Sequence, residues 1–265
     1  MLNALWTAGL TIFVFMTAAF VLARWRRTNS LIDVAWGLGF IVVTAVQFAR
    51  APAVDPAKAM VSAAVLLWGL RLSIHLGRRV WGRPEDFRYA AMKERWGRAD
   101  AVKSFFFVFM FQGLVMLVVS LPIILAFSSP SRPLAPLDVV GAAVFAAGFI
   151  FEAVGDAQLA AHIRDPANKG RLMTRGLWST TRHPNYFGEA TLWWGIGLMA
   201  VSSRHGWIGL CGPLTMTLLL VFVSGVPLLE RKYAGRPDWE AYRARTPMFV
   251  PWFPKKGCLP TDETP

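Results

Sequence analysis

The chain has 265 residues, of which 55% are hydrophobic and 17% are charged, and its mean hydropathy is +0.42. This composition excludes an ordinary soluble domain and is typical of a protein that crosses a membrane several times. The formal net charge of +12 would suit a nucleic-acid partner, but the position of the charges along the chain argues against one.

Seven apolar runs are long enough, or nearly so, to cross about 30 Å of hydrocarbon. They cover residues 3–23, 31–49, 59–77, 104–128, 136–157, 187–203 and 207–229. The runs are continuous rather than alternating, which predicts helices and not a β-barrel. The first run has no clean cleavage site, and its positive charges follow it, so we interpret it as a retained helix. We predict an all-α integral membrane protein with a single seven-helix domain over residues 1–265.

The positive charges predict the orientation of this domain. With the N-terminus outside, the segments 24–30, 78–103, 158–186 and 230–265 face the cytoplasm and hold 23 of the 28 Lys and Arg residues. The opposite loops hold four, and Arg71 lies inside the third run. This bias places the C-terminus in the cytoplasm. We expect a bacterial inner membrane, or the endoplasmic reticulum in a eukaryote, with an active site toward the cytoplasm that would suit a polyanionic cofactor.

Cysteine and histidine are too sparse to predict a metal site. Cys211 and Cys258 give neither a metal-ligand spacing nor a disulfide framework, and the four histidines are scattered. In the longest cytoplasmic loop, Tyr89, Met92 and Trp96 recur at helical spacing with charges between them. We therefore expect a short amphipathic helix at the membrane surface over residues 85–97.

Polar residues in the first three runs are the next candidates for a site. Asp33 opens the second run, where it is either an acid favoured by the helix dipole or a proton donor or cofactor contact. Arg71 and His75 are four residues apart in the third run and share one face. Trp68 lies one turn before them and Arg78 or Arg79 one turn after, a stripe that resembles the wall of a groove. An Arg within a span needs an ion partner, water or an anion.

The fifth run offers a partner for Arg71, because Glu152 and Asp156 are also four residues apart. These two acids either hold Arg71 structurally or accept hydrogen bonds from a nucleotide's ribose or amide. Gly155 between them would permit a close helix approach.

The segment 181–189, which reads TRHPNYFGE, is the most informative part of the chain. It places several polar side chains directly before an apolar run, where they are costly unless they face a polar ligand. Asn185 and Glu189 point the same way, and the Asn carboxamide is a paired donor and acceptor. Alternatively, Asn185 is an N-cap for a helix that Pro184 helps to start. Glu230, Arg231 and Tyr233 repeat this pattern where the seventh run ends.

These motifs together resemble the steroid 5-alpha-reductase family, in particular its bacterial branch, formerly catalogued as a domain of unknown function. The resemblance covers nearly the whole chain. It rests on Asp33-Val-Ala-Trp-Gly-Leu-Gly39, Leu70-Arg-Leu-Ser-Ile-His-Leu76, Glu85-Asp-x-Arg-Tyr89, Phe109-x-Phe-Gln-Gly113, Asp156-x-Gln, Arg182-His-Pro-Asn-Tyr-Phe-Gly-Glu189, Glu230-Arg-Lys-Tyr233 and Tyr242.

The C-terminal half is also similar to isoprenylcysteine carboxyl methyltransferases and phospholipid methyltransferases, which bind S-adenosylmethionine. NADPH has a pyrophosphate and a 2′-phosphate that call for several Arg or Lys residues, whereas S-adenosylmethionine has none. Arg71, Arg78, Arg79 and Arg88 would be surplus for a methyltransferase. We therefore favour the reductase and keep the methyltransferase as the alternative.

The resemblance implies an NADPH-dependent reductase of a carbon–carbon double bond conjugated to a ketone, with a steroid or similar lipophilic enone as substrate. The eukaryotic steroid reductases resemble one another in a Gln-Glu pair near the second span and a Tyr on the third. This chain has Leu31-Ile-Asp-Val at the first place and Trp68 at the second. We accordingly expect Asp33 and Trp68 to be the catalytic residues.

The resemblance also implies a cofactor site. Asn185, Glu189 and Asp156 would bind the nicotinamide and ribose. Arg71, His75, Arg79, Arg182 and the region of Tyr233 would hold the phosphates and adenine. The remaining expected cofactor-binding residues are Trp36, Tyr89, Lys169, His183, Tyr186, Glu230 and Tyr242. We expect no nucleic-acid partner and no metal.

Overall fold

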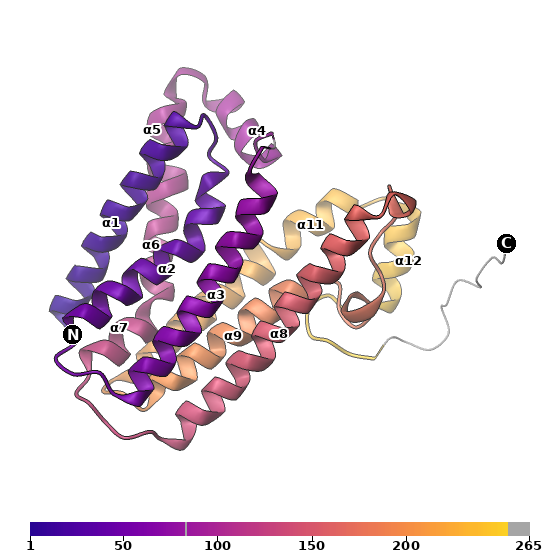
Figure 1. Cartoon of the computed structure of the whole chain (residues 1–265). Coiled ribbons are helices and arrows are strands. Elements are labelled where there is room, and N and C mark those ends of the chain that lie inside the picture. Colours follow the sequence, from indigo (N-terminus) through magenta and orange to yellow (C-terminus); the bar gives the residue numbers. More distant parts are fainter. Residues whose placement is uncertain (83, 254–265) are drawn as a thin grey trace. The chain divides into compact units, whose positions relative to one another are not determined.

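The computed structural model describes residues 1–82 and 84–253, and its regular elements within those ranges are helical (Figure 1). The α-helices are α1 (Leu2–Trp25), α2 (Leu31–Arg50), α3 (Pro56–Val80), α4 (Phe87–Trp96), α5 (Asp100–Ser104), α6 (Phe111–Val119), α7 (Leu121–Ser128), α8 (Pro136–Arg164), α9 (Pro184–Val201), α10 (Cys211–Leu218), α11 (Val226–Tyr233) and α12 (Pro237–Arg245). Two π-helical segments are η2 (Phe105–Met110) and η6 (Leu219–Val223). Short 3-10 turns are η1 (Gly97–Ala99), η3 (Pro166–Asn168), η4 (Gly176–Ser179) and η5 (Gly206–Leu210). The prediction of an all-α protein is confirmed for this part of the chain.

Six helical stretches in the described ranges are long and apolar enough to cross a membrane. They are Leu2–Trp25, Leu31–Arg50, Pro56–Val80, Phe87–Val119, Pro136–Arg164 and Gly206–Tyr233. The sixth predicted run, 187–203, falls on α9, which has 18 residues and carries Asn185 and Glu189 in its first two turns. These polar residues make α9 less apolar than the six stretches. A seventh span and the orientation of the chain stay predictions.

The expected surface helix over residues 85–97 corresponds to α4. Only Tyr89 of the predicted stripe is buried, while Met92 is exposed and Trp96 half-buried. The fourth predicted span is interrupted, because α6 ends at Val119 and α7 begins at Leu121, with Pro122 in its first turn.

The chain divides into two compact units, one formed by residues 1–142 and 196–215 and the other by residues 143–195 and 216–265. We call them unit 1 and unit 2. In unit 1, α2 and α3 approach so closely that a Cβ on Gly37 would lie 2.6 Å from the carbonyl oxygen of Gly69. A Cβ on Gly39 would instead meet the end of the Met116 side chain of α6. The glycines in the motif 33–39 therefore allow the helices to pack. A single domain over the whole chain stays a prediction.

A buried ion-pair network joins two loops and the start of α8 in unit 1. Arg132 forms a bidentate pair with Asp138, at 2.6 and 2.7 Å, and Asp138 is fully buried. Asp55 caps α3 by accepting from the backbone N–H of Lys58 at 2.9 Å and pairs with the buried Lys58 ammonium at 3.3 Å. Burial raises the pKa of Asp55, but the N–H groups of Lys58 and Arg132 outweigh it, so the pKa lies below its usual value.

In unit 2, α8 and the first half of α9 pack backbone against backbone. A Cβ on Gly148 would lie 2.7 Å from the carbonyl oxygen of Gly188, and one on Gly188 would lie 2.4 Å from the backbone nitrogen of Glu152. A Cβ on Gly155 would lie 3.3 Å from the backbone nitrogen of Asn185, so its expected role in a close helix approach is confirmed. This packing brings the polar residues of α8 beside the start of α9.

Candidate functional site

The first polar cluster lies in unit 1, around the first turn of α2. The Tyr89 hydroxyl donates a hydrogen bond to Oδ1 of Asp33 at 2.7 Å, and Nη2 of Arg88 donates to Oδ2 at 3.3 Å. The Asp33 and Arg88 side chains keep 26% and 32% of their surface exposed. The Asp33 carboxyl is therefore held by a phenol and a guanidinium and can still exchange protons with water.

The motif Glu85-Asp-x-Arg-Tyr89 explains how α4 reaches Asp33. Glu85 accepts a hydrogen bond from the backbone N–H of Asn29, and the backbone N–H of Asp86 donates to the Ser30 hydroxyl at 2.9 Å. The Asp86 side chain then caps α4 by accepting from the Arg88 backbone N–H at 3.0 Å. These bonds hold α4 at the start of α2, so that Arg88 and Tyr89 reach Asp33.

Two arginines, Arg88 and Arg79, lower the pKa of Asp86 beside this cluster. Burial raises the pKa of Asp86, but the hydrogen bonds from Arg88 and the positive charges of Arg88 and Arg79 outweigh it and hold the pKa below its usual value. Asp86 is therefore ionised near neutral pH. Arg79, predicted to bind a phosphate, is exposed at the end of α3.

The other predicted residues of unit 1 lie along α2 and α3. Trp68 is fully buried, and its ring packs edge-on against Phe40 at 5.5 Å. Trp36 is half-buried, and its ring also packs edge-on against Phe40, with 5.3 Å between ring centres. Arg71 and His75 are half-buried on α3. The expected stripe thus runs from a packed interior at Trp68 to an exposed end at Arg79.

The second polar cluster lies in unit 2 and centres on Arg182. Its guanidinium pairs with Glu230 of α11, with Nε donating at 2.8 Å and Nη2 lying 2.7 Å away. Nη1 donates to the carbonyl oxygens of Thr246 at 2.6 Å and Arg243 at 3.2 Å, at the end of α12. The Arg182 side chain is only 7% exposed. Its donors therefore hold α11 and α12, and few remain for a ligand.

His183 is buried beside this ion pair. Its Nε2 lies 3.4 Å from Glu230, and its ring stacks on Tyr186 at 5.7 Å. Burial lowers the pKa of His183 to about 4, although Glu230 acts in the opposite direction. Within the described ranges, Nδ1 is buried with no hydrogen-bond partner, as expected for a neutral ring that donates through Nε2.

Asp156 and Asn185 are brought together where α8 passes the start of α9. Nδ2 of Asn185 donates to Oδ1 of Asp156 at 3.2 Å. Asp156 is buried, whereas Asn185 and Glu189 are half-buried. The N-cap interpretation of Asn185 is wrong, because α9 begins at Pro184 and Asn185 lies inside the first turn. The role of Pro184 as a helix starter is confirmed.

The remaining predicted residues of unit 2 are dispersed. Tyr242 is buried, and its hydroxyl donates to the backbone carbonyl oxygen of Trp178, while the Trp178 indole Nε1–H donates to the carbonyl oxygen of Gly155 at 3.0 Å. Burial raises the pKa of Tyr242. Tyr233 is half-buried against Trp239, with 5.3 Å between ring centres, and Lys169 is exposed after η3.

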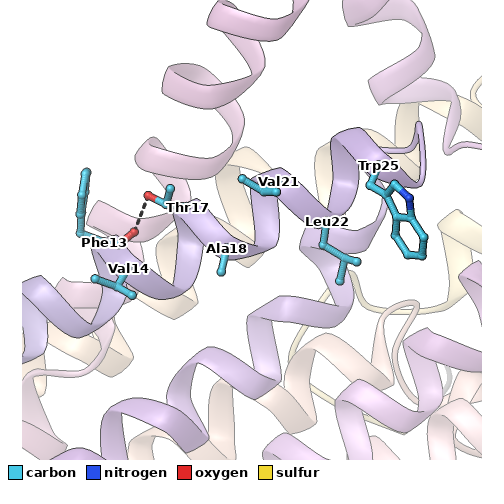
Figure 2. Close-up of a pocket in the computed structure, with 7 residues that line it drawn as sticks. All are labelled: Phe13, Val14, Thr17, Ala18, Val21, Leu22 and Trp25. Carbon is cyan, nitrogen blue, oxygen red and sulfur yellow. Dashed lines mark hydrogen bonds between the residues drawn. The ribbon is translucent and has the colours of Figure 1, made fainter.

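Two features of the described residues lie apart from these clusters. An open apolar groove follows α1 and is lined by Phe13, Val14, Thr17, Ala18, Val21, Leu22 and Trp25 (Figure 2). The Thr17 hydroxyl in this lining donates to the Phe13 carbonyl at 2.7 Å, and no candidate site residue lines the groove. No group of three or more His, Cys, Asp or Glu side chains in residues 1–82 and 84–253 is placed to hold a metal ion. Cys211 is a free, exposed thiol, and Cys258 lies outside the described residues.

Sequence reasoning missed the pairing of Arg88 with Asp33 and the internal partners of Arg182. The first had a signal, since Arg88 is part of the motif that carries Tyr89. The second had none, because the carbonyl groups of Arg243 and Thr246 belong to the backbone and leave no mark in the sequence.

Comparison with known proteins gives one match. Residues 19–246 match the family described as "Protein of unknown function (DUF1295)", and this range includes both polar clusters. No curated protein and no solved structure matches the chain.

Proposed function

We propose that this chain, which belongs to the DUF1295 family of proteins of unknown function, is a membrane-embedded, NADPH-dependent reductase of conjugated enones. The observation that carries the proposal is the hydrogen-bonded group of Asp33, Tyr89 and Arg88. A half-exposed carboxyl held by two donors, at the end of an apolar helix that crosses the membrane, is suited to deliver a proton to a lipophilic substrate. The motifs that resemble the steroid 5-alpha-reductase family include all three residues.

The residues present fit the chemical groups of NADPH. Asn185 is half-buried, and its carboxamide carries a second N–H besides the one given to Asp156, so it suits the nicotinamide carboxamide. Asp156 and Glu189 are acceptors for the ribose hydroxyls. From their charge and the family resemblance alone, we assign the phosphates to Arg71, His75 and Arg79 of unit 1, which retain exposed surface.

Arg182 has a different part in the proposal. Because its guanidinium already pairs with Glu230 and caps α12, we assign it the positioning of α9 and not a phosphate contact. Tyr242 and Trp68 are buried, and we assign both to packing.

The chemistry of the reaction divides between the cofactor and the chain. When bound, NADPH would supply the hydride that adds to the beta carbon of the enone. The carboxyl of Asp33, in its protonated form, donates a hydrogen bond to the ketone oxygen as negative charge develops there and then transfers its proton to that oxygen, which gives an enol. The enol becomes the saturated ketone when the alpha carbon takes a proton from water and the oxygen returns its proton to water. Arg88 and Tyr89 stabilise the carboxylate that remains, since both already donate to it. The exposed edge of Asp33 lets water return the proton.

The proposal includes the membrane arrangement. Counting α9 as a seventh span places the N-terminus outside, and the basic segments and the site then face the cytoplasm. The membrane would be a bacterial inner membrane, or the endoplasmic reticulum in a eukaryote. The substrate would enter from the bilayer as a steroid or another lipophilic enone.

Asp33→Asn tests the proposal. The purified chain should oxidise NADPH, followed by its absorbance near 340 nm, when a 3-oxo-Δ4 steroid is added. Asp33→Asn should lower turnover by roughly 100-fold, which is typical of a lost general acid, without weakening NADPH binding. Glu94→Gln, on the exposed face of α4, is the matched control and should keep full turnover. Equal turnover in wild type and Asp33→Asn would remove Asp33 from the mechanism.

A membrane methyltransferase is the second candidate. The observation that favours it is that Arg182, His183 and Glu230, which carry the methyltransferase resemblance, form one cluster within unit 2. Such an enzyme would need S-adenosylmethionine and would not need the Asp33 cluster.

A further inference from the structure

The segment after α12, residues 246–253, is fixed to the start of α9 and yet exposes large apolar side chains. The backbone N–H of Arg182 donates to the carbonyl of Pro247 at 2.9 Å, the Thr181 hydroxyl donates to that of Phe249 at 2.8 Å, and the backbone N–H of Trp252 donates to that of Thr180 at 2.9 Å. Against this fixed backbone, Val250, Trp252 and Phe253 are 63%, 71% and 83% exposed. Three large apolar side chains are thus held in the open.

One aromatic ring of the segment, that of Phe249, packs against the helices of unit 2. Its contacts show which part of α8 and α9 the segment lies beside. Phe249 packs edge-on against Phe187 in the first turn of α9, with 5.8 Å between ring centres. Phe187 in turn contacts Phe151 of α8, at 5.3 Å, and α8 is one of the six stretches able to span a membrane. The segment therefore leaves the bundle beside a membrane-crossing helix, close to where α9 begins.

The charged residues that flank the segment most closely in the sequence are positive. Arg243 and Arg245 come before it, and Lys255 and Lys256 follow it in the sequence, while no Asp or Glu occurs between Glu240 and Asp262. The Arg243 side chain is 56% exposed. Cations that flank exposed Trp and Phe residues are the features that favour the headgroup region of an anionic bilayer, where an aromatic ring meets both hydrocarbon and water.

We propose that residues 248–253 form a membrane-surface anchor, with Val250, Trp252 and Phe253 embedded among anionic lipid headgroups. The lipid surface is the occupant because the segment is continuous with a membrane-crossing bundle and its charge complements an anionic leaflet. The anchor would hold the C-terminal segment against the bilayer and thereby support Thr181 and Arg182 at the start of α9. The inference does not depend on the reaction that the protein catalyses.

An environment-sensitive fluorophore can test the anchor in the full-length chain. Cys211 and Cys258 are replaced by Ser, and a single cysteine is introduced as Val250→Cys for labelling with a nitrobenzoxadiazole dye. Glu240→Cys, at an exposed position of α12 in the same unit, is the matched control. Both proteins are placed in nanodiscs of phosphatidylcholine, with or without phosphatidylglycerol, and in nanodiscs that contain doxyl-labelled lipid.

The label at position 250 should emit at shorter wavelength than the label at 240 and should be quenched by the doxyl lipid. Anionic lipid should raise the ratio of embedded to exposed label by roughly fivefold for each Lys or Arg that contacts the lipid surface. High salt should reverse this gain. Equal emission and equal quenching at positions 250 and 240 would overturn the proposal. A blue shift at 250 without lipid quenching would also overturn it, because a second protein copy and not lipid would then cover the segment.

Discussion

The clusters around Asp33 and Arg182 contain the same kinds of residue, yet they differ in what their charges are free to do. In unit 2, the Arg182 side chain is 7% exposed and is surrounded by Glu230 and two backbone carbonyls. In unit 1, Asp33 and Arg88 are 26% and 32% exposed and meet at 3.3 Å. A saturated, buried ion pair stabilises a fold, whereas a half-exposed one can exchange protons and partners. In the proposed function, the Asp33 cluster accordingly does the chemistry, and the Arg182 cluster stabilises unit 2.

The largest expected effect is the difference in stability loss between a substitution in the Arg182 cluster and one in the Asp33 cluster. Arg182→Leu removes one partner of a buried pair and uncaps the last carbonyls of α12, so we expect a loss of about 3 to 5 kcal/mol of stability. Asp33→Asn keeps the shape of the side chain and its contact with Tyr89, so its cost should stay within about 1.5 kcal/mol. Thermal unfolding in detergent measures both.

Arg231→Leu is the control for Arg182→Leu, because Arg231 follows Glu230 on α11 and is exposed. It should change stability by less than about 0.5 kcal/mol. If Arg182→Leu proved as stable as Arg231→Leu and lost cofactor affinity, Arg182 would be a ligand and the contrast between the clusters would fail.

His183 provides the next effect, through pH. The pKa of His183 is about 4 in the folded chain and near 6.5 when it is exposed by unfolding. Between these values the unfolded chain binds the extra proton, so stability falls as pH falls from about 6.5 to about 4, by up to about 3 kcal/mol from this residue. His183→Gln should lack this part of the pH dependence. The difference between the stability-versus-pH curves of wild type and His183→Gln gives the contribution of His183 apart from that of the titrating carboxyl groups. Parallel curves would show that His183 is not buried as a neutral ring.

Asn185→Ala should have a smaller effect, confined to ligand binding. It removes the carboxamide beside Asp156 but leaves the Gly148 and Gly188 contacts that hold α8 to α9. We expect about tenfold weaker NADPH binding, equivalent to one lost hydrogen bond, in a protein that remains monodisperse. Isothermal titration in detergent gives the affinity. Unchanged affinity, or an aggregated variant, would assign Asn185 a structural role.

The sequence was sufficient for the helices because the apolar runs are continuous, and six of them became stretches able to span a membrane. It was less informative for α9, whose polar first turns lie among partners in unit 2. Asp33 and Tyr89 are 56 residues apart, and only the motif at 85–89 pointed to their association. The internal role of Arg182 was beyond sequence reasoning, since an Arg that binds carbonyls and an Arg that binds phosphate are the same residue type.

The choice between NADPH and S-adenosylmethionine tests the proposed function most directly. Each is titrated into the detergent-purified chain, with NADH for comparison, and the unfolding temperature is followed. We predict stabilisation by NADPH, worth about 2.7 kcal/mol at 100 times its dissociation constant, a smaller effect of NADH at equal concentration, and none from S-adenosylmethionine. Stabilisation by S-adenosylmethionine with none from NADPH would contradict the reductase and favour the methyltransferase.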